Sequence, residues 1–225
     1  MFLSQLLSGH FEPMLFLIWA VVLVIAITIH EFSHAFVAER LGDPTAKLLG
    51  RLTLNPLAHL DPLGTFALLI IGIGWGKPVP FDPFNLKNPR RDSALISLAG
   101  PASNIVMAIL ISIPYQIALR TNMLTDAWLN AYAYLMLAVW LNTLLAVFNL
   151  VPIHPLDGFK VLGGILPKEW YRDWNQMERY GIFLLLILIV PFNGQSILSQ
   201  IIFPIVSAVV NFLLPNLQFL LYSTV

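Results

Sequence analysis

Long apolar runs, separated by short stretches rich in proline and glycine, dominate the chain. The first run begins after Pro13 and continues through HEFSHAFVAERL without a helix breaker until Gly42 and Pro44. Proline suits the first turn of a helix, and a glycine followed closely by proline ends one. The pattern therefore predicts one helix over residues 13–41, about 40 Å long, which is enough to cross a hydrocarbon core of about 30 Å.

The next apolar run, residues 63–75, is too short to cross a membrane as a helix. It contains Gly64, Gly72 and Gly74, and the proline-rich stretch GKPVPFDPFNLKNPRRD follows it. A short apolar segment with several glycines favours a re-entrant or buried position over a full span. We therefore expect residues 62–92 to turn back at the membrane rather than cross it.

Four further apolar stretches predict membrane helices, at about 93–119, 127–150, 179–192 and 197–221. Composition agrees, because 58% of the residues are hydrophobic and only 11% are charged, against roughly 25% charged residues in a soluble domain. The expected fold class is an all-α polytopic membrane protein. We expect a bundle of about five to six transmembrane helices with a re-entrant segment, forming a single domain over residues 1–225.

The charges are balanced in number but unevenly placed. Twelve basic and twelve acidic residues cancel, so nothing favours a nucleic acid as partner, and the lipid bilayer is the expected surroundings. If residues 63–75 turn back, eleven lysines and arginines fall on one side of the membrane and only Arg120 falls on the other. Cytoplasmic loops are enriched in both residues, so this asymmetry supports the re-entrant interpretation and an outside N-terminus.

The HEFSH segment brings metal-binding chemistry into the first helix. The chain has no cysteine, so histidines and carboxylates must supply any metal ligands. His30 and His34 are four residues apart, so both imidazoles project from one face of a helix, with Glu31 beside them. This spacing is typical of a hydrolytic zinc site in which two histidines bind one catalytic Zn²⁺ and the glutamate acts as general base. The alternative, two histidines satisfied in a core, is costly within a membrane.

A catalytic zinc needs a third protein ligand, with its fourth position left for water. The candidates are His10, His59, His154 and Asp157, and the last two lie in NLVPIHPLDG, after a span that returns to the basic side. Asp157 is the preferred candidate because the surrounding prolines and glycine predict an unwound turn. The spacing leaves open that Asp157 only caps the helix that follows, a role compatible with metal binding.

Several motifs in the same order resemble one known family. HEFSH in a membrane helix, GPASN at 100–104 and NLVPIHPLDG at 149–158 are similar to motifs of the site-2 protease family of intramembrane zinc metalloproteases, in its small prokaryotic form. The segments LGRLTLNPLAHLDPLG and GWGKPVPFDP also look like that branch. This resemblance covers most of the chain and implies His30, His34 and Asp157 as the zinc ligands.

The resemblance also implies roles for other residues. Glu31 would be the general base, and Asn149 would orient the substrate or stabilise the oxyanion, with Asn104 a weaker candidate for that role. The stretch from 72 to 83 is similar to a membrane-associated β-hairpin whose edge receives an unwound substrate strand. His154 occupies a variable place in the motif and is expected to support the site rather than bind the metal.

The predicted function is hydrolysis of peptide bonds within or near transmembrane segments of membrane proteins, which enter laterally between helices. We expect the protein in the plasma membrane of a prokaryote, with the site opening toward the cytoplasm. A zinc transporter is the rival interpretation, but repeated ligands and two pseudo-symmetric halves are not visible in the sequence. A silent member that only binds membrane proteins is the third, and the complete set of HEFSH and Asp157 argues against it. The sequence indicates no oligomeric state.

Overall fold

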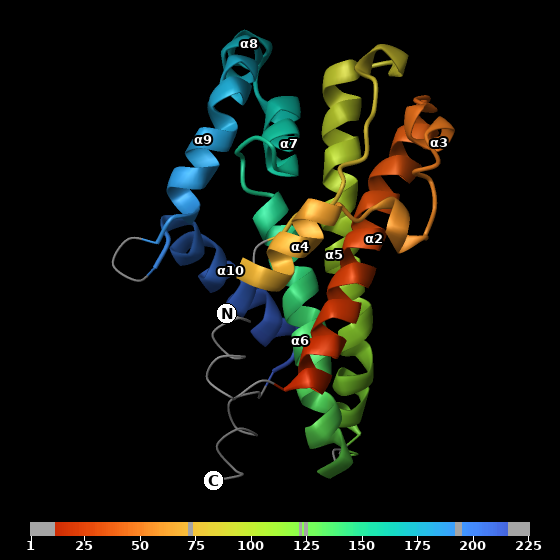
Figure 1. Cartoon of the computed structure of the whole chain (residues 1–225), viewed down its shortest axis with the longest axis vertical. Helices are drawn as coiled ribbons and strands as arrows, with labels where there is room; N and C mark the ends of the chain where they lie inside the picture. Colours follow the sequence, from red (N-terminus) through yellow and green to blue (C-terminus); the bar gives the residue numbers. More distant parts are fainter. Residues whose placement is uncertain (1–11, 72–73, 122, 124–125, 192–194, 216–225) are drawn as a thin grey trace.

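The computed structural model describes residues 12–71, 74–121, 123, 126–191 and 195–215, and they form a mostly helical molecule (Figure 1). The α-helices are α2 (Pro13–Leu41), α3 (Thr45–Leu48), α4 (Pro62–Ile71), α5 (Pro89–Arg120), α6 (Asp126–Asn149), α7 (Asp157–Ile165), α8 (Lys168–Gln176), α9 (Glu178–Ile189) and α10 (Ile197–Leu213). Two short 3₁₀ helices, η1 (Pro56–Ala58) and η2 (Pro83–Asn85), lie in the connecting loops.

Three of these helices are long and apolar enough to cross a membrane. Within the described residues they are Pro13–Leu41, Pro89–Arg120 and the Tyr132–Asn149 part of α6, while Ile197–Leu213 is a shorter apolar helix. The three long helices run lengthwise through the molecule (Figure 1), and α5 packs against α2, α6 and α7. The protein is therefore membrane-embedded, with α5 as its central helix.

Small side chains let α2 and α5 approach closely. The buried residues of α2 include Ala26, Ala35 and Ala38, and those of α5 include Gly100 and Ala108. Because lipid is as apolar as a leucine side chain, membrane helices associate through close backbone packing and hydrogen bonds rather than through the hydrophobic effect. This close approach brings the polar residues of the two helices within hydrogen-bond distance.

The apolar core lies further along α5, where α6 and α10 join it. Tyr115, Val139 and Val206, one from each helix, are all fully buried in this cluster. Elsewhere the long helices expose large apolar side chains such as Val21 and Ile109. A helix that is apolar on all sides is typical of a membrane environment, where the exposed face meets lipid.

Two glycines form the turns that end α2 and α3. Gly42 and Gly50 have φ of 106° and 69°, a left-handed conformation that costs other residues energy. In both turns the glycine N–H and the next N–H bond back to the last helical carbonyls, which is the Schellman arrangement. Asp43 and Arg51, the residues that follow these glycines, are thereby directed into the protein and are buried.

The helix predicted at 13–41 is α2, and the helices predicted at about 93–119 and 127–150 correspond to α5 and α6, within a few residues at each end. The last two predicted stretches correspond to α9 and α10, although residues 192–194 and 216–221 lie outside the described part. Helices α7 and α8 were not among the predicted membrane helices. Three long apolar helices are seen where five to six spans are expected, so the larger number stays a prediction.

The region 62–92 contains one helix, α4, followed by an extended stretch that leads to η2. Residues 72 and 73 lie outside the described part; in the rest of this region no β-strand forms, and Leu60 and Gly76 make an isolated antiparallel bridge. A hairpin there stays a prediction. Helix α4 lies across the middle of the molecule in Figure 1, while α3, α8 and the start of α5 lie at one end.

Candidate metal centre

Two helices bring the predicted metal ligands together. His30 and His34 lie one turn apart on α2 and are 5% and 7% exposed, and Asp157 is the first residue of α7. The Nε2 atoms of the two histidines are 3.0 Å apart. Oδ2 of Asp157 lies 3.1 Å from Nε2 of His30 and 3.2 Å from Nε2 of His34. Among the described residues, these three form the group that can hold a metal ion.

Gly100 of α5 makes room for both imidazoles. A Cβ atom at this position would lie within 3.0 Å of Nε2 of both His30 and His34, closer than side-chain carbon atoms are found in proteins. The absence of a side chain therefore allows α5 to pack directly against the ligand face of α2. This gives Gly100 of the GPASN motif a physical function that its position in the sequence does not reveal.

The second nitrogen of each histidine is held by an acceptor on α5. Nδ1 of His34 donates to the main-chain oxygen of Ile96 at 2.6 Å, and Nδ1 of His30 donates to Oδ1 of Asn104 at 2.7 Å. A carbonyl oxygen can only accept, so the hydrogen of the neutral His34 ring lies on Nδ1. This leaves Nε2 with a free lone pair, which is the tautomer that a metal requires.

Asn104 is oriented by two other helices. Its amide nitrogen donates to the main-chain oxygen of Ala26 on α2 at 3.1 Å and to Oδ1 of Asn142 on α6 at 3.2 Å. The nitrogen of Asn142 in turn donates to the oxygen of Ala138. Because the amide nitrogen of Asn104 is used in this way, its oxygen must face His30. Residues of α2, α5 and α6 therefore fix the orientation of His30.

The donor set fits a zinc ion. Two imidazole nitrogens and a carboxylate oxygen converge within 3.2 Å, and such groups repel one another unless a proton or a metal ion lies between them. Tetrahedral zinc with bonds of about 2.0 to 2.1 Å needs ligand atoms about 3.3 Å apart. Two histidines and one carboxylate with a position left for water are typical of catalytic zinc. The three residues thus suit zinc in both chemistry and spacing.

Glu31, the predicted general base, faces an extended segment of the chain. Its Oε2 accepts a hydrogen bond from the N–H of Val79 at 2.9 Å, and Oε1 lies near Gly76. The carboxylate is also close enough to His34 to interact with it electrostatically. Glu31 is therefore beside the ligand group, held by main chain from another part of the sequence.

Among the described residues, the other candidates are not members of this metal-binding group. Asn149, at the end of α6, donates to the main-chain oxygen of its own helix at Leu145. His154 lies 3.6 Å from a carboxylate oxygen of Glu178. His59 is fully buried, and its Nε2 lies 2.8 Å from the oxygen of Thr53. The fourth candidate ligand, residue 10, lies outside the described residues.

Several residues that shape this centre were not predicted from the sequence. Gly100 and Ile96 were not singled out, and Asn104 was considered only for contact with substrate. One signal was present: positions 96, 100 and 104 recur every four residues, so they share one face of α5. What the pattern does not reveal is that this face meets His30 and His34.

The chain is similar to several known proteins. The profile of Peptidase family M50 matches residues 116–192. "Putative zinc metalloprotease YwhC" of Bacillus subtilis strain 168 is 37% identical over 180 residues, which cover 79% of this chain and 82% of YwhC. "Putative zinc metalloprotease Rip2" of Mycolicibacterium smegmatis is 31% identical over 176 residues, 74% of this chain and 64% of Rip2. No solved structure matches at a significant level.

A more distant relative has a longer chain. "Zinc metalloprotease MJ0392" of Methanocaldococcus jannaschii is 27% identical over 155 residues, which cover 68% of this chain and 36% of that protein. The matched residues therefore cover most of YwhC but only about a third of MJ0392.

A membrane-embedded helical bundle with the HExxH spacing and a carboxylate from a second helix defines a metallohydrolase of the membrane. Its similarity to YwhC, most of whose length it covers, identifies the family. The chain belongs to Peptidase family M50, and it is a metalloprotease. This confirms the resemblance to the site-2 proteases.

Proposed function

We propose that this metalloprotease hydrolyses peptide bonds within or near transmembrane segments of other membrane proteins. The observation that carries the proposal is the depth of the metal centre. His30 lies eleven residues before Leu41, the last residue of α2, which is about 16 Å from that helix end. A site at this depth meets substrates that are themselves in the membrane.

His30, His34 and Asp157 are the residues that would hold the metal. Bound there, zinc would supply Lewis acidity, which polarises a peptide carbonyl and makes water more acidic. Asn104 and the Ile96 carbonyl keep the two imidazoles in the tautomer and orientation that binding requires. The ligand geometry is thus prepared by α5 before any substrate arrives.

Glu31 is the group that we assign to proton transfer. As the oxygen of water bonds to the peptide carbon, the carboxylate takes the proton that water loses. It then gives a proton to the amide nitrogen as the carbon–nitrogen bond breaks. The N–H of Val79 holds Oε2, so Oε1 is the oxygen that we assign to the water.

The substrate must reach this site from the lipid and in an unwound form. A helical segment keeps its carbonyl groups in internal hydrogen bonds, so the backbone has to open before cleavage. We propose lateral entry between helices, with a hairpin edge in the region 62–92 pairing with the opened strand. Asn149 is assigned to orient that strand.

We further propose an orientation with the basic end of the bundle in the cytoplasm of a prokaryote. Helices α3 and α8 and the start of α5 carry Lys47, Lys168, Arg90 and Arg91, and the opposite end of α5 carries Arg120. The positive-inside rule then puts the metal centre on the cytoplasmic side. The full count of five to six crossings belongs to the same proposal.

The decisive variants are Glu31→Gln and Asp157→Ala, tested with the purified protein in liposomes against a library of single-span proteins. The wild type should bind one zinc per chain and cleave at least one library member. Glu31→Gln should keep the zinc and lose cleavage by a factor of about a thousand or more. Asp157→Ala should lose both, because two imidazoles alone bind zinc more weakly.

Three other results would contradict these assignments. Cleavage retained by Glu31→Gln would reject Glu31 as the base, and unchanged zinc in Asp157→Ala would move the third ligand to another residue. Zinc flux into liposomes that survives Glu31→Gln, with no library member cleaved by the wild type, would favour a transporter instead.

A further inference from the structure

Arg51 is a buried cation that the metal centre does not account for. Its side chain is 6% exposed, and no carboxylate of the described residues pairs with it within 4.0 Å. Burial lowers the pKa of its guanidinium, while the charge of Glu31 opposes this effect. A buried charge is costly unless it has a structural or functional use.

The local fold directs Arg51 toward the stretch of chain that follows α4. Its N–H donates to the oxygen of Ala46 at 2.8 Å, which closes the turn at Gly50. A side chain at Gly50 would meet nothing within 4 Å, so the positive φ, rather than crowding, favours glycine there. The position of the Arg51 backbone is therefore set by the end of α3.

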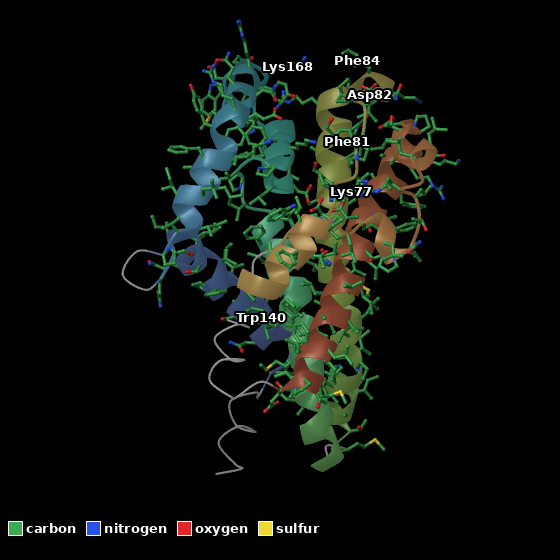
Figure 2. The ribbon with its side chains drawn as sticks, in the orientation of Figure 1. Lys77, Phe81, Asp82, Phe84, Trp140 and Lys168 are labelled. Carbon is green, nitrogen blue, oxygen red and sulfur yellow. The ribbon has the colours of Figure 1, made fainter. Side chains whose placement is uncertain are left out.

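The guanidinium holds residues 77–79 by their main chain. Nη1 donates to the oxygen of Pro78 at 3.2 Å, and Nη2 donates to the oxygen of Lys77. We call residues 77–79 the strap. Figure 2 shows Lys77 at the height of α4 and Phe81 and Asp82 progressively nearer the end of the molecule where Lys168 lies.

The strap has only two N–H groups, because its middle residue is a proline. The N–H of Lys77 donates to the oxygen of His59 at 2.8 Å, and the N–H of Val79 donates to Glu31 at 2.9 Å. The carbonyls of Lys77 and Pro78 are those that Arg51 binds. Arg51 thus holds the carbonyls of the strap, and Glu31 holds its last N–H.

We propose that Arg51 is a positioning residue for Glu31, acting through the strap. By fixing the carbonyls of Lys77 and Pro78, it holds the Val79 N–H where it can keep one oxygen of Glu31 in place. This inference rests on the proposed role of Glu31 as general base. It adds a residue from the loop after α3 to a centre otherwise built on α2, α5 and α7.

Arginine suits this role better than lysine. The guanidinium is planar and presents five N–H donors in a fixed arrangement, so it can hold two consecutive carbonyls at once. An ammonium has a similar charge but no fixed geometry. Arg51→Lys should therefore keep part of the hold on the strap that Arg51→Gln loses. If only the positive charge mattered, Arg51→Lys would behave like the wild type.

Hydrogen exchange, resolved to single amides in the full-length protein in lipid nanodiscs, tests the strap directly. In Arg51→Gln the Val79 amide should exchange at least about tenfold faster than in the wild type. Arg51→Lys should give an intermediate rate. Lys47→Gln is the matched control, because it also removes one positive charge but affects an exposed ion pair with Glu39; its Val79 exchange should be unchanged.

Kinetics with a cleaved single-span substrate supply the second readout. Arg51→Gln should lower kcat by about tenfold or more, change KM by less than about threefold, and leave one zinc bound per chain, because the base is misplaced while the metal ligands are intact. Lys47→Gln should match the wild type. If Arg51→Gln does not fold, the comparison of Arg51→Lys with the wild type gives the same test.

Wild-type exchange at Val79 together with wild-type kcat in Arg51→Gln, or in Arg51→Lys where only that variant folds, would overturn the proposal. An equal fall of kcat and of zinc content would also overturn it, since this indicates general loss of structure. The exchange measurement needs no activity, so it remains informative if no substrate is cleaved and the proposed function fails. In that case faster Val79 exchange in Glu31→Ala would still establish the contact.

Discussion

At the level of single residues, both proposed histidine ligands are held by atoms of α5 that lie outside the ligand group. His30 is held by the oxygen of Asn104 and His34 by the oxygen of Ile96, while Gly100 leaves the space that both rings occupy. These contacts decide which nitrogen carries a hydrogen and where the free nitrogen points. The residues of α5 are therefore as important to the metal centre as the HEFSH motif.

Replacing Asn104 with leucine should weaken zinc binding without unfolding the bundle. The variant removes the acceptor for Nδ1 of His30, and loss of such a partner costs about 10- to 100-fold in metal affinity. Asn142→Leu should have a smaller effect, because Asn142 contacts Asn104 rather than His30. Competition with a zinc chelator measures both affinities; equal affinities in Asn104→Leu and wild type would show that the hydrogen bond is dispensable.

Gly100→Ala should abolish zinc binding while leaving α5 helical. The added methyl group would displace both imidazoles, although alanine by itself favours a helix by roughly 0.5–1 kcal/mol over glycine. Metal content and circular dichroism separate the two effects. Ala102→Val, which adds bulk to an exposed position of the same helix, serves as the control. Full zinc occupancy in Gly100→Ala would mean that the helices separate easily.

The pairing of the two histidines could be predicted from a local signal, whereas the local signal at Asp157 left a capping role open and the resemblance to the site-2 proteases implied its place beside them. A spacing of four residues on a helix fixes a shared face, and the prolines and glycine around Asp157 mark a turn. Asn104, Gly100 and Arg51 could not be assigned their contacts in this way. Their function depends on the register between α2 and α5 and on the path of the strap, and neither follows from a local pattern.

At the scale of elements, the turns between helices determine where the functional residues lie. The limits of α2 were predictable because Pro13 and Gly42 mark them. Helices α7 and α8 were not, since Gly163, Gly164 and Pro167 interrupt the apolar pattern there and packing against α5 stabilises α7. Asp43 shows how a turn is secured, because it accepts hydrogen bonds from Thr45 at the start of α3 and from Asp82 and Asn85 at η2.

Asp43 is fully buried, and burial alone would raise its pKa. Hydrogen bonds from Thr45, from Asn85 and from the N–H of Asp82 outweigh this, so its pKa is lowered. A carboxyl group with a lowered pKa in the folded state stabilises the fold at pH values above its unfolded pKa. This stabilisation is lost as the pH falls through the folded pKa.

Asp43→Asn should therefore lower the stability of the protein at pH 7, by about 1–3 kcal/mol. The difference from the wild type should shrink as the pH is lowered below about 4. Thermal unfolding in detergent at a series of pH values measures it. Glu39→Gln, in an exposed ion pair with Lys47, should change stability by at most about 1 kcal/mol. A constant difference at every pH would contradict the assigned role of the charge.

At the scale of the whole molecule, the metal centre lies well inside the bundle, far from the end of α2. Helix α2 carries the two histidines about 16 Å from its end at Leu41, and α7 brings Asp157 back to the same level. The strap holds Glu31 through the N–H of Val79. We therefore propose that the substrate bond lies below the membrane surface when it is cleaved.

The central claim is therefore cleavage within the membrane, and mass spectrometric mapping of the cut bond tests it most directly. A single-span substrate cleaved in liposomes by the wild type should be cut inside its apolar segment, roughly ten residues from the basic flank. Glu31→Gln, with zinc still bound, should give no such product. Cuts confined to the polar flanks outside the apolar segment would contradict the account.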